Sequence, residues 1–430
     1  MKRRDVIASL AAAPLTAWLG GCGSSATKKD AVLPESIPVE LLEPTPIQVR
    51  IADLPKPFAS KSASNSSKVI ARPAGAALRV PKGFRVQVFA QGLDEPRWLA
   101  RDAGGAVLVT ETKANRITRL VDSDGDGIAE GRAVFATQDN ELDIPFGMAF
   151  SAEYFFLGNS DEVRRYRIRP GQTALDGKGE RIAELPGGGY NQHWTRNVIL
   201  APGGESLYVS VGSKSNASEE DPPRASVLVM GLDGSGMRVF ASGLRNPVGL
   251  ALQPTSGDLY ANVNERDELG DDLVPDFMTK VEDGAFYGWP YAYLTPSLLD
   301  PRQLANGISK RPDLAATTRT PEVLFQAHSA ALGLTFHPGT SFPERYRQGA
   351  FACFRGSWNR SAGTGYKLVY IPFEGGKPVG HYEDFLTGFL VAPAGPTTWG
   401  RPVGILSMPD GSVLFTEEMN GVIYRVSFAG

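Results

Sequence analysis

The side chains best suited to bind a hard cation lie in residues 243–272, "GLRNPVGLALQPTSGDLYANVNERDELGDD". An arginine and an asparagine precede an expected strand, a second expected strand follows, and the stretch ends in acids. The acids are Glu265, Asp267, Glu268, Asp271 and Asp272, with Asn264 before them and Asp276 after them. Oxygen ligands spaced this closely on a loop suit Ca²⁺. The alternative is an acidic loop that is simply solvated.

Arginines stand just before several expected strands. They are Arg97, Arg196, Arg401 and Arg245, the last followed by Asn246, while two similar stretches carry Phe146 and Leu332 at this point. If these strands surround one axis, the arginines line a single pocket that suits an anion. The alternative is that each guanidinium is buried and donates to loop carbonyls.

Histidine is rare in this chain, which has 4 of them, and two stand at corresponding points of similar stretches. His193 lies in "GGGYNQHWTRNV" and His328 lies in "FQAHSAALGL". Each is a candidate for proton transfer, and a purely structural role is the alternative. His337 precedes Pro-Gly and is expected in a turn, and His381 lies between weaker elements.

A second acidic motif, "DSDGDGIAE" at residues 122–130, also looks suited to calcium. It does not fit a helix-loop-helix calcium site, because the twelfth position counted from Asp122 is Ala133 and not glutamate. A hairpin turn built on Asp and Gly is the simpler interpretation, with an incidental calcium as the alternative.

These residues sit in a repeat that predicts the fold. Each copy has a loop, an apolar strand, a Gly-rich or Pro-Gly turn and a second strand. The copies begin near Leu93, Leu142, His193, Gly243, Ser329 and Gly400, with a longer insertion after the fourth. A period of about 40–50 residues with four strands is typical of a propeller blade. We therefore expect an all-β, six-bladed β-propeller of four-stranded antiparallel blades over residues 80–430, with the strand at "GFRVQVFAQGL" completing the blade of "GVIYRVSFAG".

Charge and cysteine content narrow the classes of partner. The net charge is −3 and no basic run follows the first few residues, which argues against nucleic acid. The 2 cysteines, Cys22 and Cys353, form no disulfide framework or haem-attachment motif. Any haem that takes part in electron transfer must therefore belong to another protein.

The N-terminus is laid out like a secretory signal. Residues 1–22 have a basic head, a short apolar stretch and an ending, Leu19-Gly20-Gly21-Cys22, that resembles a bacterial lipobox. That resemblance implies lipidation of Cys22, export to the periplasm and a lipid anchor in a membrane. Arg3-Arg4 resembles a twin-arginine signal, so both that route and the Sec route stay open, as does an ordinary signal with a chance cysteine. Residues 23–79, rich in Ser, Lys and Pro, are expected to be a flexible tether.

The later copies resemble the soluble quinoprotein sugar dehydrogenases, in particular the sorbosone/pyranose dehydrogenase branch. The matching stretches are "GLRNPVGLA", "NERDELGDDLVPDF", "GAFYGWP", "FRGSWNRSAGTGYK" and "GRPVGILSMPDG". The resemblance implies a six-bladed propeller that holds pyrroloquinoline quinone (PQQ) and Ca²⁺ on its axis. It also implies oxidation of an aldose or related sugar at the anomeric carbon, with electrons passed to an external acceptor of cytochrome or quinone type.

The resemblance also implies roles for individual residues. His193 matches the general base, Arg245 and Asn246 match the pair at the quinone, and Lys367 and Arg401 match cations that hold the cofactor's carboxylates. The calcium residues and the candidate walls complete the set. Arg266, Asp267 and Glu268 match the loop that binds the cofactor's calcium. Asp271, Asp272 and Tyr287 match a second calcium region. Trp194 and Trp358 are candidate walls for the cofactor or the sugar, and the alternative for each is packing within a blade.

The chain departs from the glucose enzymes of this family at two points. It lacks their Gly-Pro at the calcium loop, and Gln192 stands where they place an acid before the catalytic histidine. We therefore expect Asn191 or a backbone carbonyl to orient His193. Two other functions stay open. One is a non-catalytic envelope propeller that binds a protein or polysaccharide, and the other is a lactonase-type metal hydrolase, which the arginines and Lys367 disfavour.

Overall fold

The computed structural model describes residues 36–187, 193–337 and 339–430. Six antiparallel sheets of four or five strands hold most of the strand residues. The first three sheets are β7 (Pro96–Arg101), β8 (Val107–Glu111), β9 (Arg116–Val121) and β10 (Gly131–Ala136); β11 (Met148–Phe150), β12 (Tyr154–Gly158), β13 (Glu162–Arg167) and β14 (Glu180–Glu184); and β15 (Val198–Leu200), β16 (Ser206–Val211), β17 (Ser226–Gly231) and β18 (Arg238–Ser242).

The other three sheets follow in the second half of the chain, two of them with strands borrowed from the N-terminal segment. They are β19 (Pro247–Leu252), β20 (Leu259–Val263), β21 (Phe277–Lys280) and β24 (Val323–Leu324); β25 (Ala331–Phe336), β26 (Ala350–Phe354), β27 (Lys367–Ile371), β30 (Tyr382–Leu386) and β3 (Pro46–Ile47); and β33 (Pro402–Ser407), β34 (Val413–Glu417), β35 (Val422–Phe428), β6 (Phe84–Ala90) and β1 (Ser36–Ile37).

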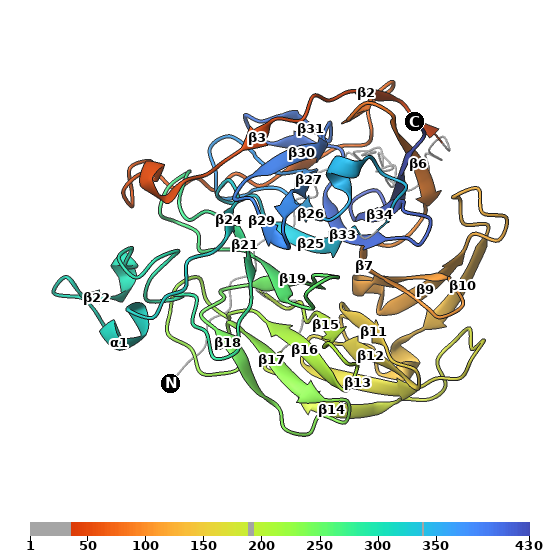
Figure 1. Cartoon of the computed structure of the whole chain (residues 1–430), viewed down its shortest axis with the longest axis horizontal. Helices are drawn as coiled ribbons and strands as arrows, with labels where there is room; N and C mark the ends of the chain where they lie inside the picture. Colours follow the sequence, from red (N-terminus) through yellow and green to blue (C-terminus); the bar gives the residue numbers. More distant parts are fainter. Residues whose placement is uncertain (1–35, 188–192, 338) are drawn as a thin grey trace, which may run out of the picture.

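The six sheets surround a central region, and β7, β11, β15, β19, β25 and β33 lie innermost (Figure 1). Each of these strands contacts the innermost strand of the next sheet, and β33 contacts β7. The prediction of an all-β, propeller-like chain is therefore confirmed. The strands β8, β20, β26 and β34 are buried along their whole length, as expected for strands covered by neighbouring sheets on both faces.

The ring closes through the two ends of the repeat. β6 pairs antiparallel with β35, so that Phe84 lies opposite Phe428 and Val86 opposite Val426. Phe84, Val86 and Val88 are buried and alternate with more exposed side chains, which is the period of a half-buried strand. The predicted pairing of these two segments is confirmed.

Shorter elements decorate the ring. The insertion between β21 and β24 holds the one α-helix among the described residues, α1 (Pro312–Ala315), and the hairpin β22 (Leu304–Ala305) with β23 (Ile308–Ser309). No helix of the described residues has the length and hydropathy needed to cross a membrane. The other short elements are the strands β28 (Phe373–Glu374), β29 (Lys377–Pro378), β31 (Leu390–Ala392) and β32 (Thr397–Thr398), and the 3₁₀ turns η1 (Ile51–Asp53), η2 (Thr112–Ala114), η3 (Gln138–Asn140), η4 (Pro301–Gln303) and η5 (Glu344–Tyr346).

The N-terminal segment corrects the expectation of a flexible tether over residues 23–79. From residue 36 onward it pairs with the sheets: β1 with β6, β3 with β30, β2 (Val39–Leu41) with β5 (Leu78–Val80), and β4 (Lys68–Val69) with β32. In Figure 1 it runs in red and orange along the outer edge near β30. Strands of two or three residues add backbone hydrogen bonds to open edges without an apolar pattern, so the composition of the segment does not reveal them. The part before residue 36, with Cys22, lies outside the described residues.

Glycines on the innermost strands set how closely the sheets approach the axis. A Cβ built on Gly404 would lie 2.2 Å from the carbonyl oxygen of Arg97, and one on Gly249 would lie 2.1 Å from that of Leu332. Neither position has room for a side chain, because the obstacle is the backbone of the neighbouring sheet. These glycines allow the sheets to converge around the centre.

We expect Gly404→Ala to destabilise the fold, because the added methyl group forces β33 away from β7. Overpacking of this kind costs about 1–3 kcal/mol. The free energy of unfolding in urea measures the effect. Gly104→Ala is the control, since its Cβ would meet side-chain atoms alone, the carboxylate of Asp102 at 3.3 Å and the guanidinium of Arg119 at 3.9 Å. Equal stability of the two variants would contradict the close-approach argument.

Candidate functional site

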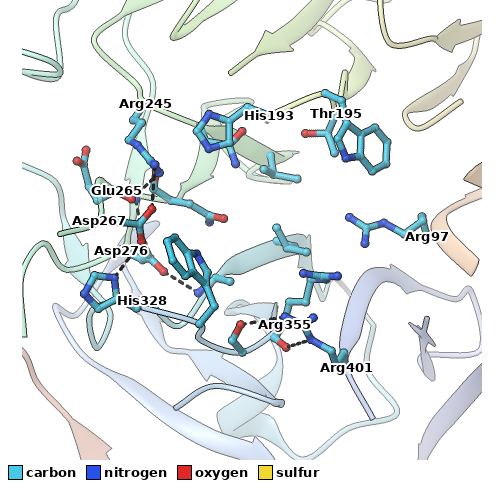
Figure 2. A pocket seen from close by; sticks show the side chains of 18 residues that line it. Arg97, His193, Thr195, Arg245, Glu265, Asp267, Asp276, His328, Arg355 and Arg401 are labelled. Atoms are coloured by element: carbon cyan, nitrogen blue, oxygen red, sulfur yellow. Dashed lines mark hydrogen bonds and ion pairs between the residues drawn. The ribbon is translucent and has the colours of Figure 1, made fainter. Parts of the chain in front are cut away.

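A cavity of about 380 Å³ lies among the loops at the centre of the ring. Its floor includes Trp194, Val248 and Leu332, which belong to a buried apolar cluster with Trp98, Phe146 and Val403. Innermost strands, or the residues just before them, contribute the members of this cluster. Apolar packing therefore closes the axis below the cavity, while polar side chains line its walls (Figure 2).

One wall is cationic. Arg97 and Arg355 both form ion pairs with the buried Glu418, and Nε of Arg355 lies 2.6 Å from its Oε1. Arg401 donates to the carbonyl oxygens of Arg355 and Gly356, at 3.2 Å each. Two guanidinium groups thus share one carboxylate and a third donates to carbonyl oxygens, so this wall keeps an excess of positive charge.

The charged groups on this wall shift one another's pKa values. Burial, and then the charge of Arg355, lower the pKa of Arg401 to about 10. Burial alone would raise the pKa of Glu418, but Arg355, Arg97 and Arg401 lower it to about 2. Both groups therefore stay ionised at neutral pH. The Nε of Arg97 is buried and has no hydrogen-bond partner among the described residues, so a donor is left for an anionic guest.

The opposite wall is a network around Asp267 (Figure 2). Nη2 of Arg245 lies 3.1 Å from Oδ2 of Asp267, and Nδ1 of His328 lies 3.4 Å from its Oδ1. Nε2 of His328 lies 3.0 Å from the carbonyl oxygen of Gly270, which can only accept a hydrogen bond. Both ring nitrogens of His328 therefore face acceptors.

The ionisation of this network follows from those contacts. Burial opposes charge at His328 and at Asp267, but the bond between them raises the pKa of His328 and, with Arg245, lowers that of Asp267. Asp267 is thus already a doubly paired carboxylate. Next to it, burial raises the pKa of Glu265 to about 7 and that of Asp276 to about 6. Oε1 of Glu265 is buried and has no partner among the described residues.

His193 also lines the cavity, between Arg245 and Thr195 in Figure 2. Its Nδ1 lies 2.9 Å from the carbonyl oxygen of Ser213, and because that oxygen can only accept, Nδ1 carries the proton. Nε2 is then the basic nitrogen. Burial, and next the charge of Arg245, lower the pKa of His193 well below its ordinary value, so the ring is neutral at physiological pH.

The backbone around His193 is held by a buried arginine. Nη1 of Arg196 donates to the carbonyl oxygens of His193 and Thr195, both at 2.8 Å. His193 itself adopts a left-handed conformation with φ of 52°. Of the two alternatives for the arginines, Arg196 follows the second alone, since it bonds loop carbonyls and does not line the cavity. Arg97, Arg245 and Arg401 line the cavity, although Arg245 and Arg401 also donate to loop carbonyls. The expected carbonyl that orients His193 is that of Ser213, whereas Asn191 and Gln192 lie outside the described residues.

Several predicted residues lie elsewhere. Lys367 does not line the cavity. Its Nζ lies 2.5 Å from Oδ1 of Asp384 on the neighbouring strand and forms an ion pair there. The predicted calcium residues other than Asp267 also point away from it. Arg266 pairs with Asp300, Glu268 with Arg302, Asp271 accepts from Ser361, Asp272 pairs with Arg360, and the hydroxyl of Tyr287 donates to the carbonyl oxygen of Lys280.

The reason for this dispersal is the course of the loop. Glu268 and Gly270 have φ of 71° and 117°, so successive side chains leave the loop in different directions and each reaches its own partner. Among the described residues, the group of carboxylates close enough together to hold a metal ion is instead Asp122, Asp124, Asp126 and Glu130 in the β9–β10 hairpin.

Arg355 was not among the predicted site residues, although this arginine stands inside "FRGSWNR". Its position relative to a strand could have identified it as a cavity residue. It directly follows β26, the second strand of its sheet, as Asn264 follows β20. In these two sheets the first residue after the second strand therefore reaches the cavity. Asn246 and Trp358 line the cavity as predicted, and Oδ1 of Asn246 is buried with no partner among the described residues.

The chain resembles known proteins over most of its length. An uncharacterized protein of Borreliella burgdorferi is 28% identical over 368 residues, which cover 82% of this chain and 91% of that protein. The PQQ-dependent pyranose dehydrogenase of Coprinopsis cinerea is 23% identical over 338 residues, which cover 69% of this chain and 45% of that enzyme. This chain thus spans less than half of the fungal enzyme.

A solved structure supports the fold. A calcium structure of the Trichoderma reesei carbohydrate-active enzyme of family AA12 superposes with a TM-score of 0.68 at 20% identity, covering 85% of this chain and 99% of that one. The TrAA12-like family model matches residues 78–283 and 301–429, well over half of the sequence. On this match, the chain belongs to the TrAA12-like family.

Proposed function

We propose that this protein is a PQQ- and calcium-dependent sugar dehydrogenase that oxidises an aldose or related sugar at its anomeric carbon. The observation that carries the proposal is a central cavity lined on one wall by three arginines, two of them paired with the buried Glu418, and lined also by a neutral histidine. The family match and the named function of the Coprinopsis relative support it. The expected six-bladed propeller, which the six sheets support, is part of the proposal.

The residues present suit the cofactor. PQQ is a flat molecule with three carboxylates and an ortho-quinone, and it needs cations along its edge. Arg97, Arg355 and Arg401 supply them, and the unpartnered Nε of Arg97 leaves a donor to use. On the other wall, Glu265 and Asn246 each have a buried oxygen without a partner among the described residues. Glu265 is the residue we propose for Ca²⁺, and Asn246 and Arg245 are those we propose for the quinone side.

The protein's own groups then have separate tasks. When bound, PQQ supplies a two-electron oxidant and Ca²⁺ supplies a Lewis acid. Nε2 of His193 accepts the proton of the sugar's anomeric hydroxyl, and Ser213 holds the ring in the tautomer that makes this possible. Asp267 and His328 hold Arg245 in place. The buried apolar floor excludes water from below.

The pH dependence should report the burial of His193. Since burial and Arg245 lower its pKa below the ordinary 6.5, the ring stays neutral as the pH falls through that value. We expect kcat/KM to stay level through this range and to fall only at more acidic pH. A pH profile of dye reduction at saturating cofactor measures this. An acid limb centred near the ordinary histidine value would contradict the assignment.

Cofactor titration tests the proposed function directly. PQQ and Ca²⁺ are added to the purified apoprotein, and the absorbance of bound cofactor and reduction of a dye are followed with a panel of aldoses. We expect saturable PQQ binding and sugar-dependent turnover. Binding without turnover on any sugar would favour the non-catalytic propeller, whereas hydrolysis of lactones without PQQ would favour the metal hydrolase.

The cellular location and the membrane anchor are proposals from the N-terminal sequence alone. We propose export to the bacterial envelope and lipid anchoring through Cys22, with electrons passed to an external cytochrome or quinone acceptor. The mass of the mature N-terminal peptide tests the anchor, because an unmodified cysteine there would exclude it.

A further inference from the structure

A segment before the family-matched region lies against the site. Residues 58–67, here called the strap, lie between η1 and β4, and the matched family region begins only at residue 78. The second half of the strap alternates in exposure, with Ala63, Asn65 and Ser67 half-buried and the serines between them exposed. This period of two shows an extended segment with one face against the protein.

The inner face of the strap is bonded to the loop that carries Asp267. The amide of Phe58 donates to the carbonyl oxygen of Leu269 at 2.8 Å, and the amide of Asp271 donates to Oγ of Ser60 at 2.7 Å. A Cβ on Gly270 would lie 2.8 Å from Oγ of Ser60, so the contact is close. The carbonyl oxygen of Gly270 is also the partner of His328. The strap therefore contacts the same turn that holds the Asp267 network.

Further along, the strap is bonded to the loop that carries Trp358. The amide of Asn65 donates to the carbonyl oxygen of Trp358 at 2.7 Å, and its Nδ2 donates to that of Ser361 at 2.9 Å and to that of Arg360 at 3.3 Å. Asn359 returns the contact, since its Nδ2 donates to the carbonyl oxygen of Ala63 at 2.5 Å.

Asn359 also joins the two loops to each other. It is 2% exposed, and its Oδ1 accepts from the amide of Glu268 at 2.7 Å. The amide of Ser361 donates to Oδ1 of Asp271 at 2.9 Å. The loops at 268–271 and 358–361 thus form one bonded unit, and the strap lies across both.

Trp358 is the exposed residue of that unit that also lines the cavity. It lines the cavity and is 45% exposed, whereas Arg97 is 6% exposed and Arg245 is 2% exposed. An aromatic side chain that faces both the cavity and solvent is placed to meet what enters from outside, which is the sugar, and not the group held deep between the arginines. We propose that the strap is part of the sugar-binding site, in which Asn65 and Asn359 are positioning residues that fix Trp358 as a wall for the sugar.

This inference rests on the proposed function, and kinetics of the full chain loaded with PQQ and Ca²⁺ test it. Asn65→Ala removes the two Nδ2 bonds. We expect KM for the sugar to rise about 3- to 10-fold, with kcat within about 2-fold and PQQ affinity unchanged, because a lost hydrogen bond that acts only on sugar binding changes KM and not turnover. Ser66→Ala is the matched control, since Ser66 is an exposed residue of the same strap, and it should keep the parental KM.

A double variant shows whether the effect passes through Trp358. In the Trp358→Ala background, Asn65→Ala should raise KM no further. Hydrogen exchange of the apoprotein gives a readout that needs no activity: the amides of 358–361 should exchange faster in Asn65→Ala, with those of β26 unchanged.

Each other outcome overturns the inference. A parental KM in Asn65→Ala, an equal further rise in the Trp358→Ala background, or a loss of PQQ affinity in place of sugar affinity would each do so. A parent protein that neither binds PQQ nor oxidises sugars would overturn the proposed function, and with it this inference. A parent that turns over normally while Asn65→Ala keeps its KM would overturn this inference alone.

Discussion

Replacing His193 by alanine is expected to lower kcat about 10²–10⁴-fold while PQQ and Ca²⁺ still bind, because a positioned general base is worth a factor of that size. Nε2 of His193 is the basic nitrogen, since Nδ1 is committed to the carbonyl oxygen of Ser213. Its lowered pKa keeps it unprotonated at neutral pH, so the base is ready without prior loss of a proton.

The measurement is kcat for dye reduction, paired with a PQQ titration of the same preparation. His381→Ala is the control, because His381 is a histidine outside the central cavity. Turnover of His193→Ala equal to that of the parent would remove the base assignment. A loss of PQQ binding in place of turnover would instead make His193 a cofactor-binding residue.

The architecture was predictable because the same pattern of strands and turns recurs along the chain. A strand pair that recurs along the chain identifies the sheets even where one copy is weak, and β6, which closes the ring by pairing with β35, begins with a clear alternation of its own. The N-terminal strands were not predictable in the same way. β1, β3 and β4 have two residues each, so they show no period and are defined only by the edges they pair with.

The site was predictable where position in the repeat fixed it and not where a loop did. Arg97 is the second residue of β7, Arg401 immediately precedes β33 and Arg245 lies two residues before β19, and all three reach the cavity. The acids at 265–272 follow a strand and then a turning backbone, so closeness in sequence does not bring their carboxylates together. Ion pairs formed within the protein, such as Arg266 with Asp300, also depend on partners far away in the sequence.

Lys367 is a residue that the sequence placed at the site and that the structure places outside the cavity. The resemblance assigned it to the cofactor's carboxylates because it stands in a matching stretch, yet it opens β27 and pairs with Asp384 of β30. Arg355, which precedes it in the same stretch, lines the cavity in its place. A motif thus predicted the correct segment, but only the register of β26 and β27 decides which cation of the segment faces the centre.

Arg401 and Lys367 therefore provide a matched pair for the second prediction. Arg401→Met should weaken PQQ binding by about 30-fold or more, because loss of one partner of a buried charge contact costs about 2–5 kcal/mol. Lys367→Met removes the same charge from the same half of the molecule and should leave PQQ affinity unchanged, since its ammonium is held by Asp384 outside the cavity.

The comparison separates local contact from general charge. The dissociation constant of PQQ is measured by absorbance titration at a fixed, saturating Ca²⁺ concentration, with the free energy of unfolding of each variant as a check on folding. If the cavity attracts the cofactor only by its overall charge, the two variants lose affinity equally and lose it less at high salt. If the guanidinium of Arg401 contacts a carboxylate, it alone matters. A loss confined to Lys367→Met would restore the original assignment of that lysine and would show that the cofactor binds elsewhere than among Arg97, Arg355 and Arg401.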